Sequence, residues 1–280
     1  MRPVAFVLAS VLLLMTRPLA DDTVYTLKDG TTCPAQGQTE TAKVQKLNRH
    51  KNRATVPGAG DLDDSITLAA MLQPPDAENG DEERFNEEKA GKIQGYVISV
   101  KTSKTPESCN CYAKEPVDQD THIEVALSKQ APENQRVIVE VTPRLRKLMK
   151  EAANNTDNDW STETLNKRLK GQWVEFTGWM TFDYMHADKS ENTNPGGTGN
   201  FRATAWEVHP VTSIKLLAGP PANTPELHPT HLAAFQAASF RRVTQDPNKK
   251  EVIAKRLAKY LEGLSPRDLE EKEQEEKDRP

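Results

Sequence analysis

Residues 92–101 read KIQGYVISVK, the first of five alternating runs on which the predicted fold rests. Ile93, Gly95, Val97 and Ser99 fall on one face of an extended chain, and the residues between them fall on the other. A period of two in a run rich in β-branched residues is typical of a β-strand. The stretch therefore predicts the first strand of a sheet.

Four more runs share this alternation and are expected to be strands: residues 121–128, 136–143, 172–182 and 202–216. Pro210 stands midway in the last run, and because proline has no amide to donate, we expect a bulge, a bend or a sheet edge there. Two helices lie between the third and fourth runs. Pro143 begins the first, which continues to Ala153, and Ser161 caps the second, which ends before Gly171.

The order strand–strand–strand–helix–strand–strand is that of the five-stranded OB barrel. The expected fold class is therefore mainly β with flanking helices, built on one OB-type barrel over residues 91–218. With 280 residues, of which 36% are hydrophobic and 28% charged, the chain suits one core with polar extensions.

The two extensions are expected to be helical and partly disordered. Residues 21–90 contain a short mobile lead, an amphipathic helix and a second helix that Asp64 caps, at 21–36, 39–53 and 66–72. Residues 219–280 contain two helical stretches and an almost fully charged end, at 231–241, 249–261 and 266–280. We expect the charged end to be frayed or solvated.

Residues 1–20 resemble an export signal. Arg2 precedes an apolar run from Val4 to Met15, and Ala20 stands before an acidic pair. The run is short for a membrane span, which favours a cleaved signal peptide over an anchor, and the alternative is a buried N-terminal helix. We therefore expect an exported protein, periplasmic or extracellular, without a transmembrane anchor.

The three cysteines are Cys33, Cys109 and Cys111. Export places them in an oxidising compartment. A bond between cysteines two residues apart is strained, so we expect Cys33 to pair with Cys109 or with Cys111 and to leave one thiol free. A metal pair at Cys109 and Cys111 is the alternative, although one CxC without a partner motif is a weak signal.

Four side chains could form a site on the barrel. His122, Glu140, Glu207 and His209 each alternate with apolar neighbours that face the core. If their faces coincide, the set could hold a divalent metal, with His122, Glu207 and His209 as ligands, or could work as acid and base. The alternative is that they are ordinary polar residues on the solvated face of a half-buried sheet, which alternation alone predicts.

The long segment between the last two strands is a second candidate. It contains Asp183, His186 and Asp188, which could bind a cation, and three glycines follow. Loops of this length are either functional or simply mobile, and in OB barrels this position often borders the ligand groove. Arg202 and Trp206 follow the loop and complete the ligand-binding candidates.

Nucleic-acid binding needs clustered positive charge beside stacking aromatics. Residues 91–219 hold 16 Lys or Arg and 16 Asp or Glu, so the barrel does not favour it. The local patch of Arg144, Arg146, Lys147 and Lys150 is explained by the exposed side of an amphipathic helix. The sequence contains no Gly-rich phosphate loop, nucleophile elbow or zinc-protease helix.

Two resemblances add to this picture. Four stretches between residues 40 and 217 resemble a family of exported bacterial proteins of unassigned function: Lys46-Leu47-Asn48-Arg49, Cys109-Asn110-Cys111, Asp120-Thr121-His122-Ile123-Glu124 and Arg202-Ala203-Thr204-Ala205-Trp206-Glu207-Val208-His209-Pro210-Val211-Thr212. This resemblance implies export and no known reaction.

The second resemblance is to thermonucleases of the staphylococcal type, which are OB barrels that use calcium, acidic residues and arginines. It rests on Asp118-Gln119-Asp120-Thr121, Val141-Thr142-Pro143 and Asn200-Phe201-Arg202. It implies Asp120 as a metal ligand and Arg202 as a phosphate clamp. Arg144 and Val141 depart from the family pattern, since they stand where it has its essential Glu and a metal-binding Asp. A reversed charge at the base position should abolish that mechanism.

The sequence alone therefore favours an exported, non-catalytic OB module that holds an unidentified ligand or surface partner on its open sheet face. The alternatives are a metal-dependent hydrolase or nuclease-like phosphodiesterase, and a nucleic-acid binder.

Overall fold

The computed structural model describes residues 24–75, 80–153, 159–221, 234, 236–238 and 246–277. The predicted signal peptide and most of the helix expected at 231–241 lie outside these residues. Five strands close into one barrel in the order β3-β4-β5-β7-β6. Their bounds are Ala90–Thr102, Thr121–Ala126, Val137–Val141, Trp206–Leu216 and Trp173–Phe182 in that order.

All neighbours in the barrel are antiparallel except β5 and β7, which run parallel. Helices α3 (Pro143–Ala153) and α4 (Thr162–Leu169) join β5 to β6, so the order of elements is the one predicted for an OB-type barrel. Ser161 caps α4 as expected, because its side chain accepts a hydrogen bond from the amide of Thr164.

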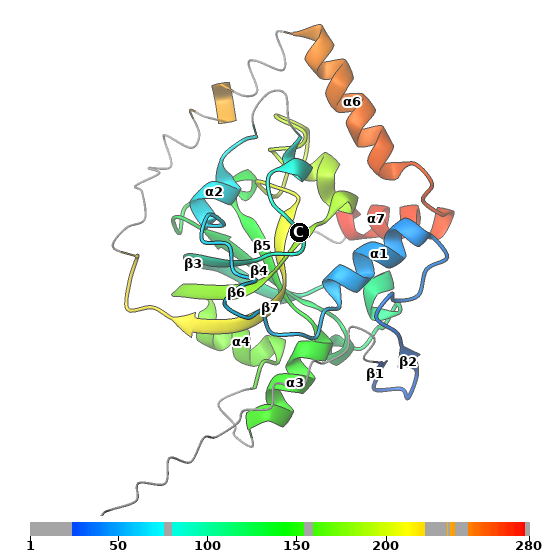
Figure 1. The fold of residues 1–280 in the computed structure, drawn as a ribbon, viewed down its shortest axis with the longest axis vertical. Coiled ribbons are helices and arrows are strands. Elements are labelled where there is room, and N and C mark those ends of the chain that lie inside the picture. The colour runs from blue at the N-terminus through cyan, green and yellow to red at the C-terminus, as the bar shows by residue number, and fades with distance from the viewer. Residues whose placement is uncertain are drawn as a thin grey trace, which may run out of the picture.

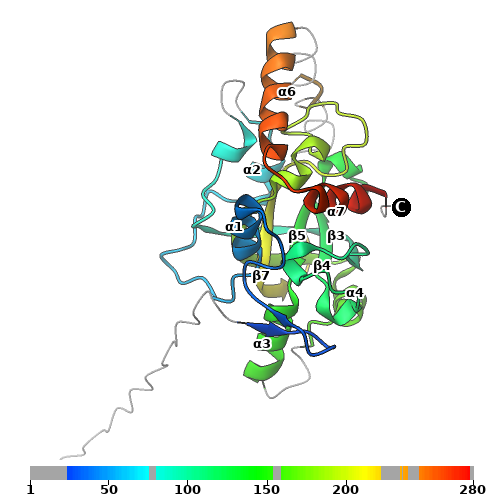
Figure 2. The same cartoon turned by 90° about the vertical axis from the view of Figure 1, so that its right-hand side faces the viewer.

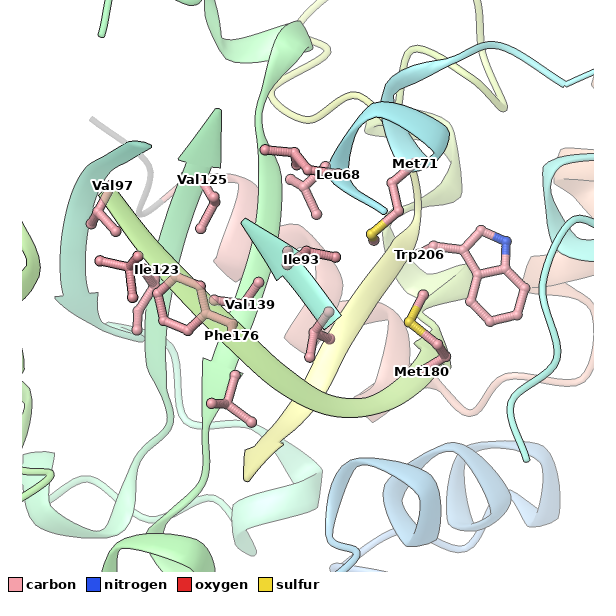
Figure 3. Packing of buried hydrophobic residues seen from close by; sticks show 14 of the residues in the cluster. Leu68, Met71, Ile93, Val97, Ile123, Val125, Val139, Phe176, Met180 and Trp206 are labelled. Atoms are coloured by element: carbon pink, nitrogen blue, oxygen red, sulfur yellow. The ribbon is translucent and has the colours of Figure 1, made fainter. Parts of the chain in front are cut away.

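The inward faces of the strands fill the barrel with apolar side chains. Ile93, Val97, Ile123, Val139 and Phe176 are fully buried and point toward one another (Figure 3). Helix α2 (Leu68–Leu72) packs Leu68 and Met71 against this core. Thr67, and not Asp64 as predicted, caps α2, because the Thr67 hydroxyl accepts from the amide of Ala70.

Two irregularities shift the alternation that the sequence shows. In β3 the register with β4 changes between Val97 and Ser99, so Val100 is buried although it lies on the predicted opposite face. In β6 the register with β7 changes on both sides of Gly178, beside Pro210, as expected for a strand that contains proline. A Cβ at Gly178 would lie 2.3 Å from the Pro210 carbonyl oxygen, which explains why glycine stands there.

The part of the predicted lead that the structure describes contains regular structure that the sequence pattern did not predict. It forms a small hairpin, β1 (Tyr25–Thr26) with β2 (Thr32–Cys33), which precedes helix α1 (Ala42–Lys51). Leucine and valine side chains of α1 are buried, as its amphipathic pattern predicts.

At the charged C-terminal end, expected to be frayed or solvated, residues 266–277 form a helix whose side chains are mostly exposed to solvent. Helix α6 (Pro247–Leu261) is followed by α7 (Pro266–Lys277), which lies beside α1 in both views (Figures 1 and 2). Asp268 of α7 accepts hydrogen bonds from the hydroxyls of Thr39 and Thr41, so polar contacts rather than apolar ones hold this helix on the body. None of the described helices is long and apolar enough to cross a bilayer.

Candidate metal centre

Ionisable side chains gather on the outer face of β4, β5 and β7. His122, Glu140 and His209 alternate with the inward residues Ile123, Val139 and Val208, and so point away from the barrel core. The register places His122 directly opposite Glu140. The parallel pairing of Val139 with Val208 then brings Glu140 beside His209. Strand register alone therefore aligns three candidate ligands.

These side chains do not face water, which overturns the alternative that they lie on a solvated sheet face. Helix α1 packs over β6 and β7, and the 3-10 helix η2 (Ser108–Asn110) packs against α1. As a result His122 is 5% exposed, Glu140 2% and His209 0%. Buried polar groups of this kind need partners, because burial without them is costly.

Six buried side chains form a closed ring of contacts, which we call the histidine–carboxylate ring: Glu107, Cys109, Asp120, His122, Glu140 and His209. The His122 Nε2 atom lies 3.2 Å from Glu140 Oε2 and 3.4 Å from Glu107 Oε1. The two nitrogens of His209 lie 3.5 Å from Glu140 Oε2 and 3.7 Å from Asp120 Oδ2. The Cys109 Sγ atom closes the ring at 3.4 Å from Glu107 and 3.6 Å from Asp120.

Several atoms in the ring are close to one another without being hydrogen-bonded. Five of its nitrogen and oxygen atoms have no hydrogen-bond partner among the residues that the structure describes: Glu107 Oε1, Asp120 Oδ1, His122 Nε2, Glu140 Oε2 and His209 Nε2. Each of these atoms carries a lone pair when its group is deprotonated. Lone pairs that face one another at 3–4 Å are the arrangement that a cation stabilises.

The ring contains two groups of three donors within metal-binding reach of one another. In each group the ligand atoms all lie within 4.8 Å, and the groups are Glu107 with Cys109 and Asp120, and Asp120 with Glu140 and His209. Asp120 belongs to both groups. Imidazole nitrogen, thiolate sulfur and carboxylate oxygen are the donors that zinc-class ions prefer.

A neighbouring cluster, the lysine–arginine cluster, has a different electrostatic balance. It consists of Lys51, Asp183, His186, Arg202 and Glu207. The Lys51 ammonium lies 2.8 Å from Asp183, which also contacts His186 at 2.9 Å, and Arg202 pairs with Glu207. Glu207 reaches His209 at 3.2 Å and joins the two clusters. Although Asp183, His186 and Glu207 lie within 4.8 Å of one another, Lys51 and Arg202 already neutralise the two carboxylates.

The pKa shifts reflect the surplus of negative charge in the ring. Burial lowers the pKa of His122, but the charges of Glu140 and Glu107 outweigh burial and raise it well above its ordinary value. The pKa of His209 is raised for the same reason, with Glu140 as its main anionic neighbour. Burial raises the pKa of Asp120 to about 6, and Glu107 and Glu140 add to that shift. The ring therefore attracts protons when it holds no other cation.

Two of the three cysteines form a disulfide, and the third belongs to the ring. Cys33 is bonded to Cys111, which ties the β1–β2 hairpin to the segment after η2. Cys109 remains a free, buried thiol in the ring. Burial, together with Glu107 and Asp120, raises the pKa of Cys109 well above its ordinary value, so the thiol stays protonated unless a cation takes the place of the proton.

The other candidates from the sequence lie elsewhere or have other partners. Trp206 packs against Phe85 and Phe182, its indole donates to the Asp81 carbonyl, and it lies apart from the ring. Asp183, His186 and Arg202 lie in the lysine–arginine cluster. The structure thus brings together the predicted residues His122, Glu140, Glu207 and His209, and separates Trp206 from them.

The two residues to which the thermonuclease resemblance gives roles lie in different clusters, Asp120 in the histidine–carboxylate ring and Arg202 in the lysine–arginine cluster. Arg202 pairs with the buried carboxylate of Glu207, and Asp118 accepts hydrogen bonds from the Tyr25 hydroxyl and the Lys28 amide. The Arg144 guanidinium donates to the carbonyls of Cys33 and Pro34 and is buried. Arg144 therefore does not lie on the exposed side of its helix, as the sequence suggested.

Sequence reasoning missed Lys51 and Glu107. Lys51 is the last residue of an amphipathic helix, and Glu107 lies in an irregular segment, so neither has a local pattern that separates it from other charged residues. The short spacing from Glu107 to Cys109 is the one signal that could have drawn attention to Glu107.

Comparisons with known proteins return no match: no family model, curated protein or solved structure is similar to this chain.

Proposed function

We propose that this chain is an exported OB-type module that binds one divalent metal ion of the zinc class in the histidine–carboxylate ring. The ion would lie beside Asp120, with Glu140 and His209 as further ligands and with Cys109 as the donor from the group that contains Glu107. The sequence predicted a binding module with an unidentified ligand, and in this proposal that ligand is the metal ion.

One observation carries the proposal: five buried nitrogen and oxygen atoms of the ring have no hydrogen-bond partner among the described residues. With neutral histidines, Glu107, Asp120 and Glu140 leave three negative charges in a space from which water is excluded. A divalent ion offsets most of that charge and uses the lone pairs that are otherwise unsatisfied. The lysine–arginine cluster lacks this surplus, which is why we place the ion in the ring.

Burial favours a binding role over hydrolysis. Every ring residue is at most 5% exposed. A catalytic ion keeps an open coordination position that substrate can reach, whereas a structural ion is enclosed by protein ligands. We therefore propose that the ion stabilises the outer face of the barrel, where the N-terminal segment and α1 meet it.

Export is supported by the cysteine arrangement. A disulfide between Cys33 and Cys111 is typical of proteins that fold in oxidising compartments. Together with the signal-like residues 1–20, it favours the periplasm or the extracellular medium as the location. Intact-mass measurement of the secreted chain would show whether an N-terminal segment ending near Ala20 has been removed.

The test is metal content and metal-dependent stability of the purified full chain. We expect zinc to co-purify near one ion per chain, or to raise the thermal midpoint when added to the chelator-treated protein. Saturation at about 100 times the dissociation constant stabilises a protein by about 2.7 kcal/mol. Asp120→Asn removes the shared carboxylate and should weaken zinc binding at least about 100-fold, the upper end of the loss known for residues that only support a ligand.

Glu124→Gln is the matched control. Glu124 is a buried carboxylate of β4, four residues after Asp120, but it pairs with Lys101 and Arg136 outside the ring. We expect this variant to bind zinc as the unaltered chain does. A chain that contains no stoichiometric metal, and whose thermal midpoint does not change with zinc, manganese or calcium, would mean that protons alone balance the ring.

A further inference from the structure

A second site candidate is a surface pocket of about 860 Å³ that shares no residue with the ring. It lies between α3, α4, the end of β3, the β1 strand and the 3-10 helix η3 (Pro116–Asp118). Figures 1 and 2 show α3 and α4 at the end of the molecule farthest from α6. The volume is in the range of pockets that hold small organic ligands.

Much of the pocket surface is apolar. Trp160, 7% exposed, and Val100, 3% exposed, belong to the barrel core and also line the pocket. Pro143 and the half-exposed side chain of Val117 contribute to the same lining. A ligand with an aromatic or aliphatic body would gain free energy by covering this surface.

The charged side chains of the lining are mainly basic: Lys101, Arg146, Lys147, Lys150 and Lys167, against Asp159 and Glu163. Most of them already have partners. Lys101 pairs with Glu124, Lys167 pairs with Glu163, and the Asp159 carboxylate accepts from the hydroxyls of Ser161 and Thr164.

Lys147 and Lys150 differ from the other charged residues of the pocket. Both are exposed on α3, and neither forms an ion pair with a residue that the structure describes. Arg146 beside them donates to the carbonyls of Val117 and Gln119, so its role is to hold η3 in place. Two ammonium groups thus remain outside ion pairs with the described residues, and the charge of Lys150 also reaches the Asp159 carboxylate of the same pocket.

The pocket walls are tied to the body of the protein, so little ordering is needed on binding. The Tyr25 hydroxyl donates to Asp118 at 2.9 Å, and the Asn166 amide donates to the Val100 carbonyl at 2.6 Å. Hydroxyls of Thr121 and Thr162 join β4 to the start of α4 at 2.5 Å. A preformed pocket binds with a smaller entropic cost than one that must be assembled.

We propose that this pocket binds a small organic anion with an apolar body, with Lys147 and Lys150 recognising the negative group. The charge balance favours an anion over a neutral ligand, and a volume of about 860 Å³ suits a small molecule. This site is independent of the proposed metal centre.

The test uses 8-anilinonaphthalene-1-sulfonate, an aromatic anion whose fluorescence rises in apolar surroundings, and the full chain in its folded state. We expect saturable binding near one probe per chain that weakens as salt is raised. The double charge reversal Lys147→Glu with Lys150→Glu should weaken binding at least about tenfold. Each lysine that contacts the sulfonate should contribute at least as much binding free energy as an exposed ion pair.

The control variant is Lys249→Glu with Lys250→Glu on α6, which makes the same change of net charge outside the pocket. We expect it to bind the probe within about twofold of the unaltered chain, an effect no larger than that of a weak surface ion pair. A thermal midpoint shared by all three proteins shows that the probe reports a pocket and not an unfolded state.

Three results would overturn the proposal. The first is no saturable binding, and the second is equal binding by both charge-reversed variants. The third is that the pocket variant loses as much affinity for the uncharged probe N-phenyl-1-naphthylamine as for the anionic probe. The last result would mean that the pocket accepts apolar molecules without regard to charge.

Discussion

At Asp120 the carboxylate lies between the thiol of Cys109 and the imidazole of His209. The three groups come from different parts of the chain, and each has a pKa raised by its surroundings. A group with a raised pKa holds a proton that a metal ion can displace. The ring is therefore a place where protons and metal compete, and its chemistry should depend strongly on pH.

We predict that the metal-free protein loses stability as the pH rises above about 6.5. The folded-state pKa values of His122 and His209 lie above the ordinary value of 6.5, so folding favours their protonated forms. Their contribution is complete below 6.5 and is lost as the pH rises through the folded-state values. Each extra proton held by the folded state costs about 1.4 kcal/mol of stability per pH unit. Urea unfolding at pH 6, 7 and 8 in the presence of a chelator measures the effect.

The corresponding control is the same series with zinc at saturation. Metal binding requires deprotonated ligands, so the zinc-bound protein should gain stability with rising pH over this range. His122→Gln should flatten the pH dependence of the metal-free protein. If the stability of the metal-free protein were constant from pH 6 to pH 8, folding would not favour protonated His122 and His209.

Among the elements, α7 shows how a very polar segment is held on a folded body. Its sequence from Pro266 to Lys277 is almost free of apolar residues, yet Asp268 is 0% exposed and Lys272 is 7% exposed. Lys272 pairs with Asp188 at 2.7 Å, and the Ser108 amide beside Cys109 donates to Glu271. The helix thus fixes the segment that carries Cys109 through hydrogen bonds and ion pairs.

We predict that Asp268→Asn lowers the free energy of unfolding by about 1–3 kcal/mol, the range for losing hydrogen bonds to a buried charged acceptor. Asp268 accepts from Thr39, Thr41 and Ser265, and an amide at this position can accept at only one of its two terminal atoms. Hydrogen exchange should also become faster over residues 266–277, which shows that the loss is local to α7.

Asp246→Asn on α6 serves as the control. Its carboxylate accepts from the Asn248 amide at the start of the helix, where asparagine caps about as well as aspartate. We expect unchanged stability and unchanged exchange over α7. If both variants behaved alike, α7 would not depend on the Asp268 contacts.

At the scale of the whole molecule, segments from both ends of the chain meet on one side of the barrel. The β1–β2 hairpin is bonded to the segment after η2 through Cys33 and Cys111, which are 78 residues apart. Helix α1 covers the ring from the N-terminal side, and α7 contacts α1 and η2 from the C-terminal side (Figure 2). Burial of the ring is therefore a property of the complete fold and not of the barrel alone.

We predict that Cys33→Ser with Cys111→Ser lowers the free energy of unfolding by about 2–5 kcal/mol. A disulfide that closes a long loop restricts the unfolded chain, and its removal restores that freedom. The barrel core does not include either cysteine, so far-UV circular dichroism should stay the same while the denaturation midpoint falls. Cys109→Ser is the matched control, and in the absence of metal it should change the midpoint by much less. An equal effect of the two changes would contradict the assigned pairing.

The strands, their order along the chain and the helices between them could be predicted from the amino-acid sequence. Alternation such as that of Ile123 and Val125, or of Val137 and Val139, is a local property of the chain, and so is the cap at Ser161. It also placed His122, Glu140 and His209 on the outward face of their strands. Local patterns suffice for these features because they depend on neighbours within a few residues.

What covers that outward face could be seen only once distant segments were packed together. Alternation cannot distinguish a face in contact with water from one beneath a helix that lies 70 residues away in sequence, as α1 lies from β4. The same kind of distant contact accounts for three other features that the sequence did not predict. These are the positions of Lys51 and Glu107, the pairing of Cys33 with Cys111 and not Cys109, and the docking of α7. Burial depends on which segments pack together in space. It is burial that leaves nitrogen and oxygen atoms of these outward side chains without hydrogen-bond partners among the described residues.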